Sequence, residues 1–176
     1  AADKVLNSHS TANVIYALWL SPDGVYKMSQ EIKGMVQTSL NLGTAYLDAD
    51  KLVYKYLIRS NTAAGKKLLL ERVTTFVKHL SGKVVTMSDY PAWEYKSDSQ
   101  LRKICVESFT NVYGHEPEVT SIHAGLECGI LAGKMPGVDM ISFGPTLESV
   151  HTPDECMDAA SVERTWEYLM EILKSL

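Results

Sequence analysis

The residues best suited to chemistry gather in one stretch, residues 119–155, which reads VTSIHAGLECGILAGKMPGVDMISFGPTLESVHTPDE. His123 ends a β-branched run and precedes a turn at Gly125, and His151 stands in a loop that Pro153 stiffens. Imidazole is a common metal ligand in proteins. Because α/β enzymes place ligands where strands end in glycine turns and loops, this stretch predicts a functional site or half of one.

Short strands and helices are predicted to position these residues. The strands are residues 119–123 and 140–143, and a helix opens at Leu126-Glu127-Cys128. An earlier helix has the capping-box spacing of Ser97 and Gln100 and ends at Gly114. A last helix carries an apolar stripe that predicts core packing: Val162, Trp166, Leu169, Leu173 and Leu176. These elements are too few to bury both faces of a parallel sheet, so we expect partner strands from another part of the protein.

The first half of the chain predicts a different layout. Apolar periodicity indicates a helix at 12–20, strands at 35–42 and 51–60, a helix at 62–80 and a strand at 83–87. This α-β-β-α-β order is a βαββαβ sandwich without its first strand. A natural three-stranded α+β module has the same order, so the order alone leaves both interpretations open.

Several motifs in this chain resemble the C-terminal part of the aminoacyl-histidine (Xaa-His) dipeptidases. They are HAGLECG at 123–129, DMISFGPT at 139–146 and HTPDE at 151–155, in this order and at this spacing. LIRS at 57–60 and YPAWEY at 90–95 also look like that family, a branch of the metal-dependent dipeptidase and aminoacylase superfamily with paired zinc ions. The resemblance extends from about Ser21 to the C-terminus.

The resemblance implies an α/β chain of two parts. Residues 1–88 would belong to an α+β lid-type two-layer sandwich, inserted in the related enzymes into the catalytic domain. Residues 89–176 would be the C-terminal α/β segment of a zinc-peptidase catalytic domain. Because the related lids dimerise, a homodimer formed through the lid is expected.

Three residues acquire roles through the resemblance. His151 would be a ligand of one of two divalent ions, expected to be Zn²⁺, and its alternative is a surface loop histidine. Arg59 would clamp the substrate's terminal carboxylate with its planar guanidinium, and its alternative is a solvated arginine beside Lys55. Gly125 would line the substrate pocket with backbone groups, and its alternative is a tight turn without a ligand.

Three further residues have roles that the sequence leaves open. His123 and Glu127 are candidate pocket residues, although a glutamate in the first turn of a helix is also favourable against the helix dipole. Glu155 is a candidate for fixing the loop and the ring orientation of His151. Helix capping before Ala159 is its alternative.

The chain lacks most of the metal centre that the family requires. That centre also needs an H-x-D motif, a bridging aspartate, a Glu-Glu pair and a further carboxylate, and neither H-x-D nor consecutive glutamates occurs here. These groups and the general base would come from the N-terminal catalytic half, so no catalytic residue is assigned in this chain. The implied function is the C-terminal portion of a metal-dependent dipeptidase that hydrolyses Xaa-His or related dipeptides with a free C-terminus, inactive by itself.

Composition excludes several other classes of function. A net charge of −4 without a basic cluster argues against nucleic acid and anionic membrane as partners. No apolar run approaches the ~20 residues that span a bilayer. Three cysteines outside C-x-x-C spacing favour a reducing, cytoplasmic location over a disulfide framework or a cysteine zinc site.

A non-catalytic interaction module is the alternative function. The lid-type sandwich could serve as a dimerisation surface, with the remainder of the chain vestigial. A standalone hydrolase is disfavoured, because one histidine cannot hold a zinc ion in tetrahedral coordination.

Overall fold

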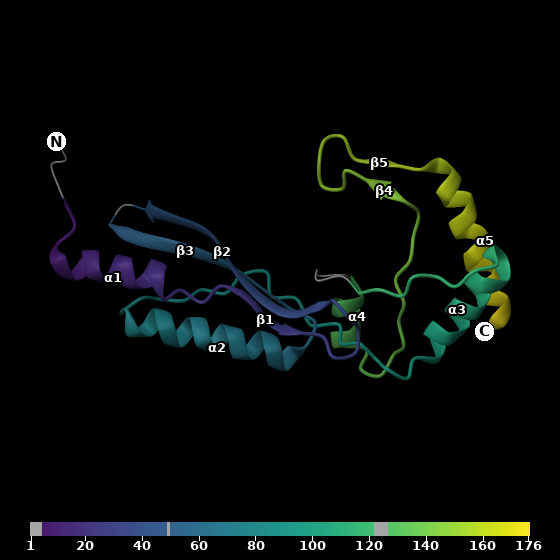
Figure 1. Ribbon diagram of the computed structural model, residues 1–176, viewed down its shortest axis with the longest axis horizontal. Helices are drawn as coiled ribbons and strands as arrows, with labels where there is room; N and C mark the ends of the chain where they lie inside the picture. The colour runs from purple at the N-terminus through teal and green to yellow at the C-terminus, as the bar shows by residue number, and fades with distance from the viewer. Residues whose placement is uncertain (1–4, 49, 122–126) are drawn as a thin grey trace. The chain divides into compact units, whose positions relative to one another are not determined.

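The computed structural model describes residues 5–48, 50–121 and 127–176. The chain divides into two compact units, and the helices and strands of each are labelled in Figure 1. The first unit takes residues 1–95 and 121–134, and the second takes residues 96–120 and 135–176. Both units combine helices with an antiparallel sheet, which confirms the expected mixed α/β class.

A three-stranded antiparallel sheet forms the centre of the first unit. Its strands are β1 (Gly24–Met28), β2 (Val36–Asp48) and β3 (Lys51–Ser60), in the order β1-β2-β3. The predicted alternation along β2 and β3 is confirmed, because Thr38 and Leu40 are buried while Tyr56 and Ile58 pack against the same core.

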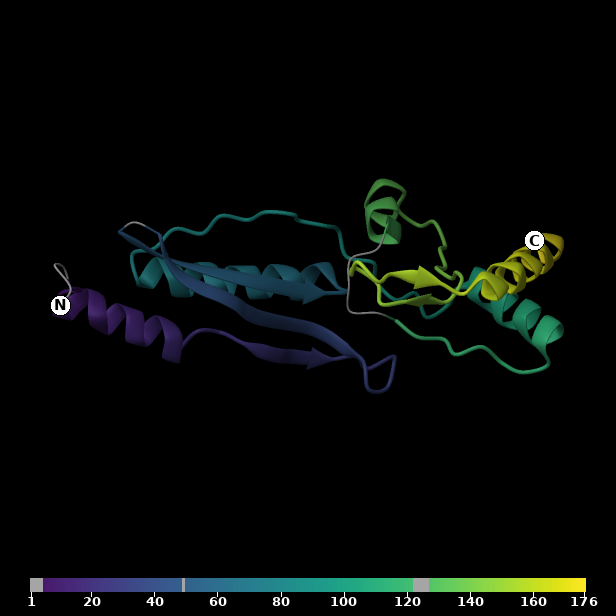
Figure 2. The same ribbon diagram turned by 90° about the horizontal axis from the view of Figure 1, so that it is seen from above.

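The helix α2 (Ala63–His79) covers that face of the sheet, and it runs alongside the strands in the views of Figures 1 and 2. Its buried residues Leu69 and Val73 join Leu40 in the core of the unit. The side chain of Thr62 caps the helix by accepting a hydrogen bond from the Gly65 amide at 3.2 Å. The helix thus covers one face of the sheet, and on the other face, here called the open face, the side chains of Lys55, Leu57 and Arg59 are exposed.

The predicted strand at residues 83–87 is wrong. The segment has no strand assignment, and Val85 and Met87 are 78% and 75% exposed. A strand needs a hydrogen-bonded neighbour, and no strand of the described residues pairs with this segment. The third strand is instead β1, which begins at Gly24, directly after Pro22-Asp23. The order of elements in the first 80 residues is α-β-β-β-α.

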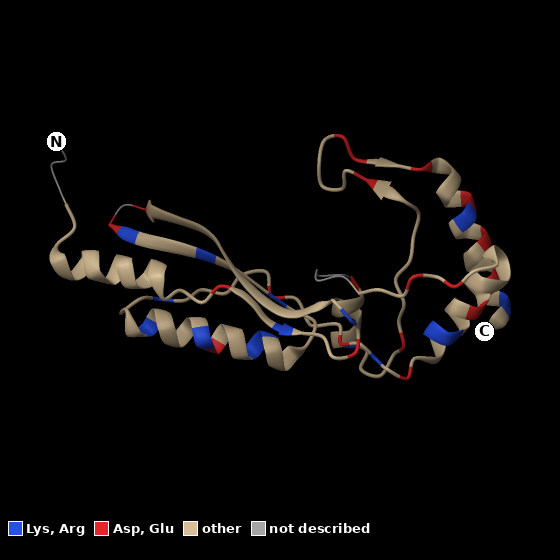
Figure 3. Ribbon diagram, viewed as in Figure 1, with Lys and Arg blue, Asp and Glu red and all other residues tan. Residues whose placement is uncertain are grey.

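The helix α1 (Ser8–Trp19) precedes the sheet, as the apolar segment predicted. It contains no Lys, Arg, Asp or Glu, so it is entirely tan in Figure 3. Ala17 is its one buried residue, whereas Ile15, Tyr16, Leu18 and Trp19 are exposed. The helix thus presents an apolar surface to its surroundings.

Two helices form the core of the second unit. They are α3 (Gln100–Tyr113) and α5 (Ala159–Ser175), which meet through Cys105, Tyr168 and Ile172. The Tyr168 hydroxyl donates a hydrogen bond to the Cys105 carbonyl at 2.9 Å. Burial raises the pKa of Tyr168 far above its ordinary value, so this side chain stays neutral. No helix of the described residues is long and apolar enough to cross a membrane.

The predicted strands at 119–123 and 140–143 do not form where the structure describes them. Residues 119–121 and 140–143 carry no strand assignment, and residues 122–123 lie outside the described residues. Ile141 packs against the core of the second unit, and the Phe143 ring lies 4.8 Å from that of Tyr168. These apolar side chains therefore pack against helices from an irregular backbone, which pairs with no strand in the part of the chain that the structure describes.

Two predicted features of the helices also need correction. The N-cap of α3 is Ser99, not Ser97, whereas Gly114 is confirmed as its left-handed C-cap with φ +75°. The stripe on α5 is not core, because Val162, Trp166 and Leu173 are 41%, 61% and 56% exposed. The face that packs against α3 is the neighbouring one, with Tyr168 and Ile172.

Candidate functional site

The loop that carries His151 is closed by a short β-ladder. The strands β4 (Leu147–Glu148) and β5 (Cys156–Met157) pair antiparallel, and residues 149–155 connect them. The Thr152 hydroxyl donates to the Ser149 carbonyl at 2.7 Å, and the Glu155 amide donates to the Thr152 carbonyl at 3.1 Å. The HTPDE sequence therefore folds as a compact turn, with His151 exposed on it.

His151 occupies an unusual backbone conformation. Its φ is +66°, and Ser149 two residues earlier has φ +52°. A residue with a side chain in this region costs about 1–3 kcal/mol, and such residues cluster at functional sites. The His151 amide donates to the Glu155 carboxylate at 2.7 Å. A hydrogen bond to a charged group contributes about 1.5–3 kcal/mol and less when exposed, which is the right size to offset the strain.

Hydrogen bonds join the base of this loop to α5. The Asp158 amide donates to the Thr146 carbonyl at 3.0 Å, and the Thr146 amide donates to the Ser161 hydroxyl at 2.8 Å. Asp158 is the N-cap of α5, where its side chain accepts from the Ala160 amide. The helix-capping alternative for Glu155 is therefore wrong, because Asp158 fills that position.

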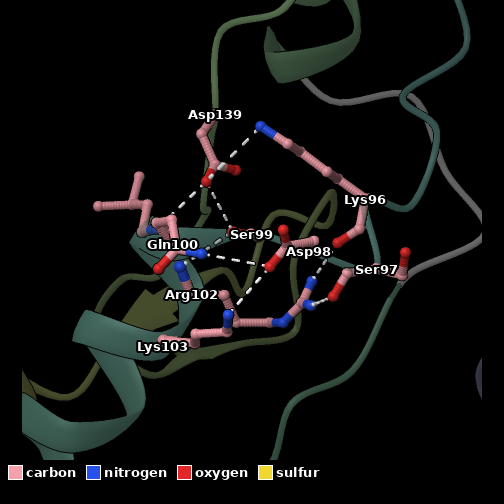
Figure 4. Close-up of polar contacts among 9 residues, drawn as sticks. Lys96, Ser97, Asp98, Ser99, Gln100, Arg102, Lys103 and Asp139 are labelled. Carbon is pink, nitrogen blue, oxygen red and sulfur yellow. Dashed lines mark hydrogen bonds and ion pairs between the residues drawn. The ribbon is translucent and has the colours of Figure 1, made fainter.

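Asp139, the first residue of the DMISFGPT motif, anchors this motif to α3 (Figure 4). Its carboxylate accepts from the Ser99 hydroxyl at 3.0 Å and from the Leu101 amide at 3.1 Å, and Lys96 Nζ lies 4.0 Å away. Desolvation alone would raise the pKa of the Asp139 carboxyl. The hydrogen bonds from Ser99 and Leu101, together with the Lys96 charge, hold that pKa below its ordinary value.

Arg59 lies at the end of β3, beside the N-terminus of α2. It pairs with Ser39 across the ladder and is exposed, on the face of β3 opposite to Tyr56 and Ile58. The Glu94 carboxylate of the YPAWEY segment accepts from the Ala63 amide at 2.9 Å and so caps the first turn of α2. The strand end that carries Arg59 is therefore held next to the YPAWEY segment.

The helix α4 (Glu127–Lys134) belongs to the same unit as Arg59 and also contacts the YPAWEY segment. A Cβ added at Gly129 would lie 2.7 Å from the Pro91 carbonyl oxygen, and one added at Gly133 would lie 3.0 Å from the Pro91 ring. These two glycines thus allow close packing of the helix on Pro91. Glu127 is exposed in the first turn of α4, where a carboxylate favours the helix dipole. His123 and Gly125 lie outside the described residues.

The predicted site residues thus fall into two groups. Arg59 and Glu127 belong to the first unit, whereas His151 and Glu155 belong to the second and share a hydrogen bond. Sequence patterns did not reveal the roles of Asp139 or Pro91, because both contacts join segments distant along the chain. The acidic residue inside a run of apolar residues at 138–143 was the one signal for Asp139.

The donor chemistry for a metal ion is incomplete in this chain. His151 offers an exposed imidazole in a fixed loop, which suits a metal ligand. Across residues 5–48, 50–121 and 127–176, no group of three His, Cys, Asp or Glu side chains could hold a metal ion. A tetrahedral site needs four ligands. The described residues therefore do not form a complete metal site by themselves.

Comparisons with known proteins match nearly all of this chain to peptidases. Peptidase family M20/M25/M40 matches residues 12–175. A cytosol non-specific dipeptidase of Escherichia coli (strain K12) is 33% identical over 177 residues, which cover 100% of this chain and 36% of that protein.

Solved structures show the same partial coverage. An aminoacylhistidine dipeptidase from Vibrio alginolyticus matches with a TM-score of 0.89 and 33% identity, over 100% of this chain and 36% of that chain. The aminopeptidase PepT from Bacillus cereus matches with a TM-score of 0.62 and 16% identity, over 93% of this chain and 44% of that chain, which shows a shared fold. The chain thus spans little more than a third of the length of the two dipeptidases.

Proposed function

Since the chain belongs to peptidase family M20/M25/M40, we propose that it is the C-terminal portion of a metal-dependent dipeptidase. The observation that carries this proposal is the match to the Escherichia coli dipeptidase, which runs along all of this chain and a third of that protein. The substrates would be Xaa-His or related dipeptides with a free C-terminus, as the name of the Vibrio alginolyticus enzyme suggests. By itself the chain would be inactive.

The metal centre would be completed by the N-terminal catalytic half of the same protein. His151 would supply one ligand, and the remaining ligands and the general base would come from that half. When bound, two divalent ions, Zn²⁺ in our proposal, would supply Lewis acidity toward the scissile carbonyl and lower the pKa of a water. The task of this chain is then to hold the His151 imidazole in place, which the closed loop supports.

Arg59 would bind the terminal carboxylate of the dipeptide. Its position at a strand end, on the open face of the sheet, supports that role. The backbone around Gly125 would line the pocket, and His123 and Glu127 would stand at its wall. The packing of α4 on Pro91 supports a fixed position for the segment that follows this turn.

The two parts of the chain would have different tasks. Residues 1–88 would be part of a lid that forms a homodimer, and residues 89–176 would be the C-terminal segment of the catalytic domain. The exposed apolar surface of α1 supports a lid that associates with another surface. We also propose a cytoplasmic location, which the likeness to a cytosol dipeptidase supports. Neither nucleic acid nor a membrane is proposed as a partner.

A non-catalytic dimerisation module is the second candidate. The apolar surface of α1 favours it as well, because association alone would account for that surface. Peptidase activity of the full-length protein distinguishes the two candidates, since a module with a vestigial remainder would hydrolyse nothing.

The proposal is tested on a dipeptide and on its C-terminal amide. We expect the full-length protein to hydrolyse an Xaa-His dipeptide and this chain alone to show no turnover above the metal-only blank. Arg59→Lys should lower kcat/KM for the free dipeptide, because an ammonium keeps the positive charge but lacks the planar fork that binds a carboxylate bidentately. For the C-terminal amide, which offers no carboxylate, the variant's kcat/KM should fall little.

Lys55→Arg is the matched control, since Lys55 lies on the same face of β3 as Arg59. Equal losses on dipeptide and amide, or no loss on either, would show that Arg59 does not bind the carboxylate. Absence of turnover by the full-length protein would favour the non-catalytic module.

A further inference from the structure

The Glu155 side chain makes its hydrogen bond to the backbone of His151 and not to the ring. Glu155 Oε2 accepts from the His151 amide nitrogen at 2.7 Å. A backbone hydrogen bond closes the same turn, because the Glu155 amide donates to the Thr152 carbonyl at 3.1 Å. Two hydrogen bonds thus hold residues 151–155 as a closed turn, one from the His151 amide to the Glu155 side chain and one from the Glu155 amide to the Thr152 carbonyl.

The conformation of His151 gives this contact its importance. With φ at +66°, His151 lies in the left-handed region that residues with side chains rarely adopt. The backbone angles set the direction of the Cα–Cβ bond and the allowed rotamers, and hence where the imidazole can reach. The Glu155 carboxylate accepts a hydrogen bond from the His151 amide in this conformation.

We infer that Glu155 is a positioning residue, which holds the His151 backbone so that the imidazole is presented to the metal ion. This inference rests on the proposed function, in which His151 is a ligand. It assigns Glu155 no contact with the metal or the substrate. The ordinary route by which an outer residue orients a histidine ligand is a bond to its second ring nitrogen. Here the orientation is imposed through the peptide group.

The other polar groups of the loop do not share this task. The Thr152 hydroxyl donates to the Ser149 carbonyl at 2.7 Å and accepts from the Asp154 amide at 3.2 Å. The Asp154 carboxylate, one residue from Glu155, makes no hydrogen bond or ion pair within the ranges that the structure describes. Asp154 is therefore a matched control carboxylate in the same loop.

Four variants of the full-length protein test the inference: Glu155→Ala, Glu155→Gln, Asp154→Asn and His151→Ala. The readouts are the Kd for Zn²⁺ by competition with a chelator, the urea midpoint of the metal-free protein, and kcat and KM. Glu155→Ala should weaken Zn²⁺ binding by about 10–100-fold, the range for residues that orient a metal ligand. Its urea midpoint should stay near that of the parent, because an exposed loop can relax out of the strained conformation once the hydrogen bond is lost, without unfolding the rest of the protein.

Glu155→Gln discriminates positioning from direct contact. The amide oxygen of glutamine can still accept from the His151 amide, so Zn²⁺ affinity should stay within about 5-fold of the parent. Asp154→Asn should match the parent. A loss in Glu155→Gln as large as that in Glu155→Ala would overturn the inference, since the charge itself would then be required.

The failure of the inference is distinguishable from the failure of the proposed function. If His151→Ala loses metal while Glu155→Ala binds Zn²⁺ like the parent, Glu155 does not position the ligand and the proposed role of His151 stands. If His151→Ala keeps full metal loading, His151 is not a ligand, and both ideas fall together.

Discussion

At the scale of single residues, Asp139 is a helix cap supplied from 40 positions away in the sequence. Its carboxylate accepts from both the Ser99 hydroxyl and the Leu101 amide at the start of α3. A carboxylate at a helix N-terminus is stabilised by the helix dipole. Asp139 thereby fixes the beginning of the segment that leads to the β4–β5 loop.

Asp139 should make the stability of this chain depend on pH. Its folded-state pKa is below the ordinary value, so its contribution is complete above that value and is lost as the pH falls through the folded-state pKa. Asp139→Asn should lower the free energy of unfolding by roughly 0.5–1 kcal/mol near neutral pH. Urea titrations between about pH 5 and pH 3 should show the difference from the parent shrinking.

Glu107→Gln is the control for this titration, because Glu107 is an exposed carboxylate on the same helix. It should leave the pH dependence unchanged. A difference between Asp139→Asn and the parent that stays constant with pH would mean that the charge of Asp139 contributes nothing.

Some residue roles can be predicted from sequence and others cannot. The HTPDE motif identified His151 as a candidate, and its left-handed backbone is a feature that a functional loop histidine can have. The target of Glu155 was open, since a carboxylate near a helix start can cap the helix or bind a loop amide. Asp158 is the N-cap of α5, and Glu155 binds the His151 amide in the loop.

At the scale of elements, the junction of β3 and α2 depends on a glycine. The Ser60, Thr38 and Thr62 hydroxyls surround Gly65, and a Cβ there would lie 2.6 Å from the first two oxygens and 2.8 Å from the third. The hydroxyls of Thr38 and Ser60 are themselves hydrogen-bonded at 2.9 Å. The helix can approach the sheet this closely because Gly65 has no side chain.

Gly65→Ala should therefore destabilise the chain. Alanine gains about 1 kcal/mol of helix propensity over glycine, but overpacking costs about 1–3 kcal/mol, so we expect a net loss. The free energy of unfolding from urea titration measures it. Ala64→Gly, at an exposed position of the same turn, should lose only the propensity difference. A Gly65→Ala variant more stable than the parent would show that the three hydroxyl side chains move aside at little cost.

Elements whose signal is local were predicted well. The bounds of β3 match the predicted strand at 51–60, and α2 differs from the predicted helix by one residue at each end. The strands at 83–87 and 140–143 were wrong because an apolar run becomes a strand only beside a hydrogen-bonding partner. Periodicity along a single segment carries no information about that partner.

At the scale of the whole molecule, α5 has a broad apolar arc of which one side is covered. The covered stripe contains Tyr168 and Ile172, and the stripe one residue further along contains Val162, Trp166 and Leu173. Stripes offset by one residue lie about 100° apart on a helix. Sequence periodicity found the second stripe and assigned it to the core. Its exposure agrees with the proposal that another part of a longer protein covers it.

Trp166→Ala tests that proposal, because the loss of unfolding free energy on removing this side chain depends on what surrounds it. In this chain alone Trp166→Ala should change the free energy of unfolding by no more than about 0.5 kcal/mol, since the side chain is 61% exposed. In the full-length protein the same change should cost about 3–5 kcal/mol, as for a buried tryptophan. Ile172→Ala, at a residue buried against α3, should cost about 2–5 kcal/mol in both contexts. Equal, small effects of Trp166→Ala in both proteins would mean that the rest of the enzyme does not pack on this stripe.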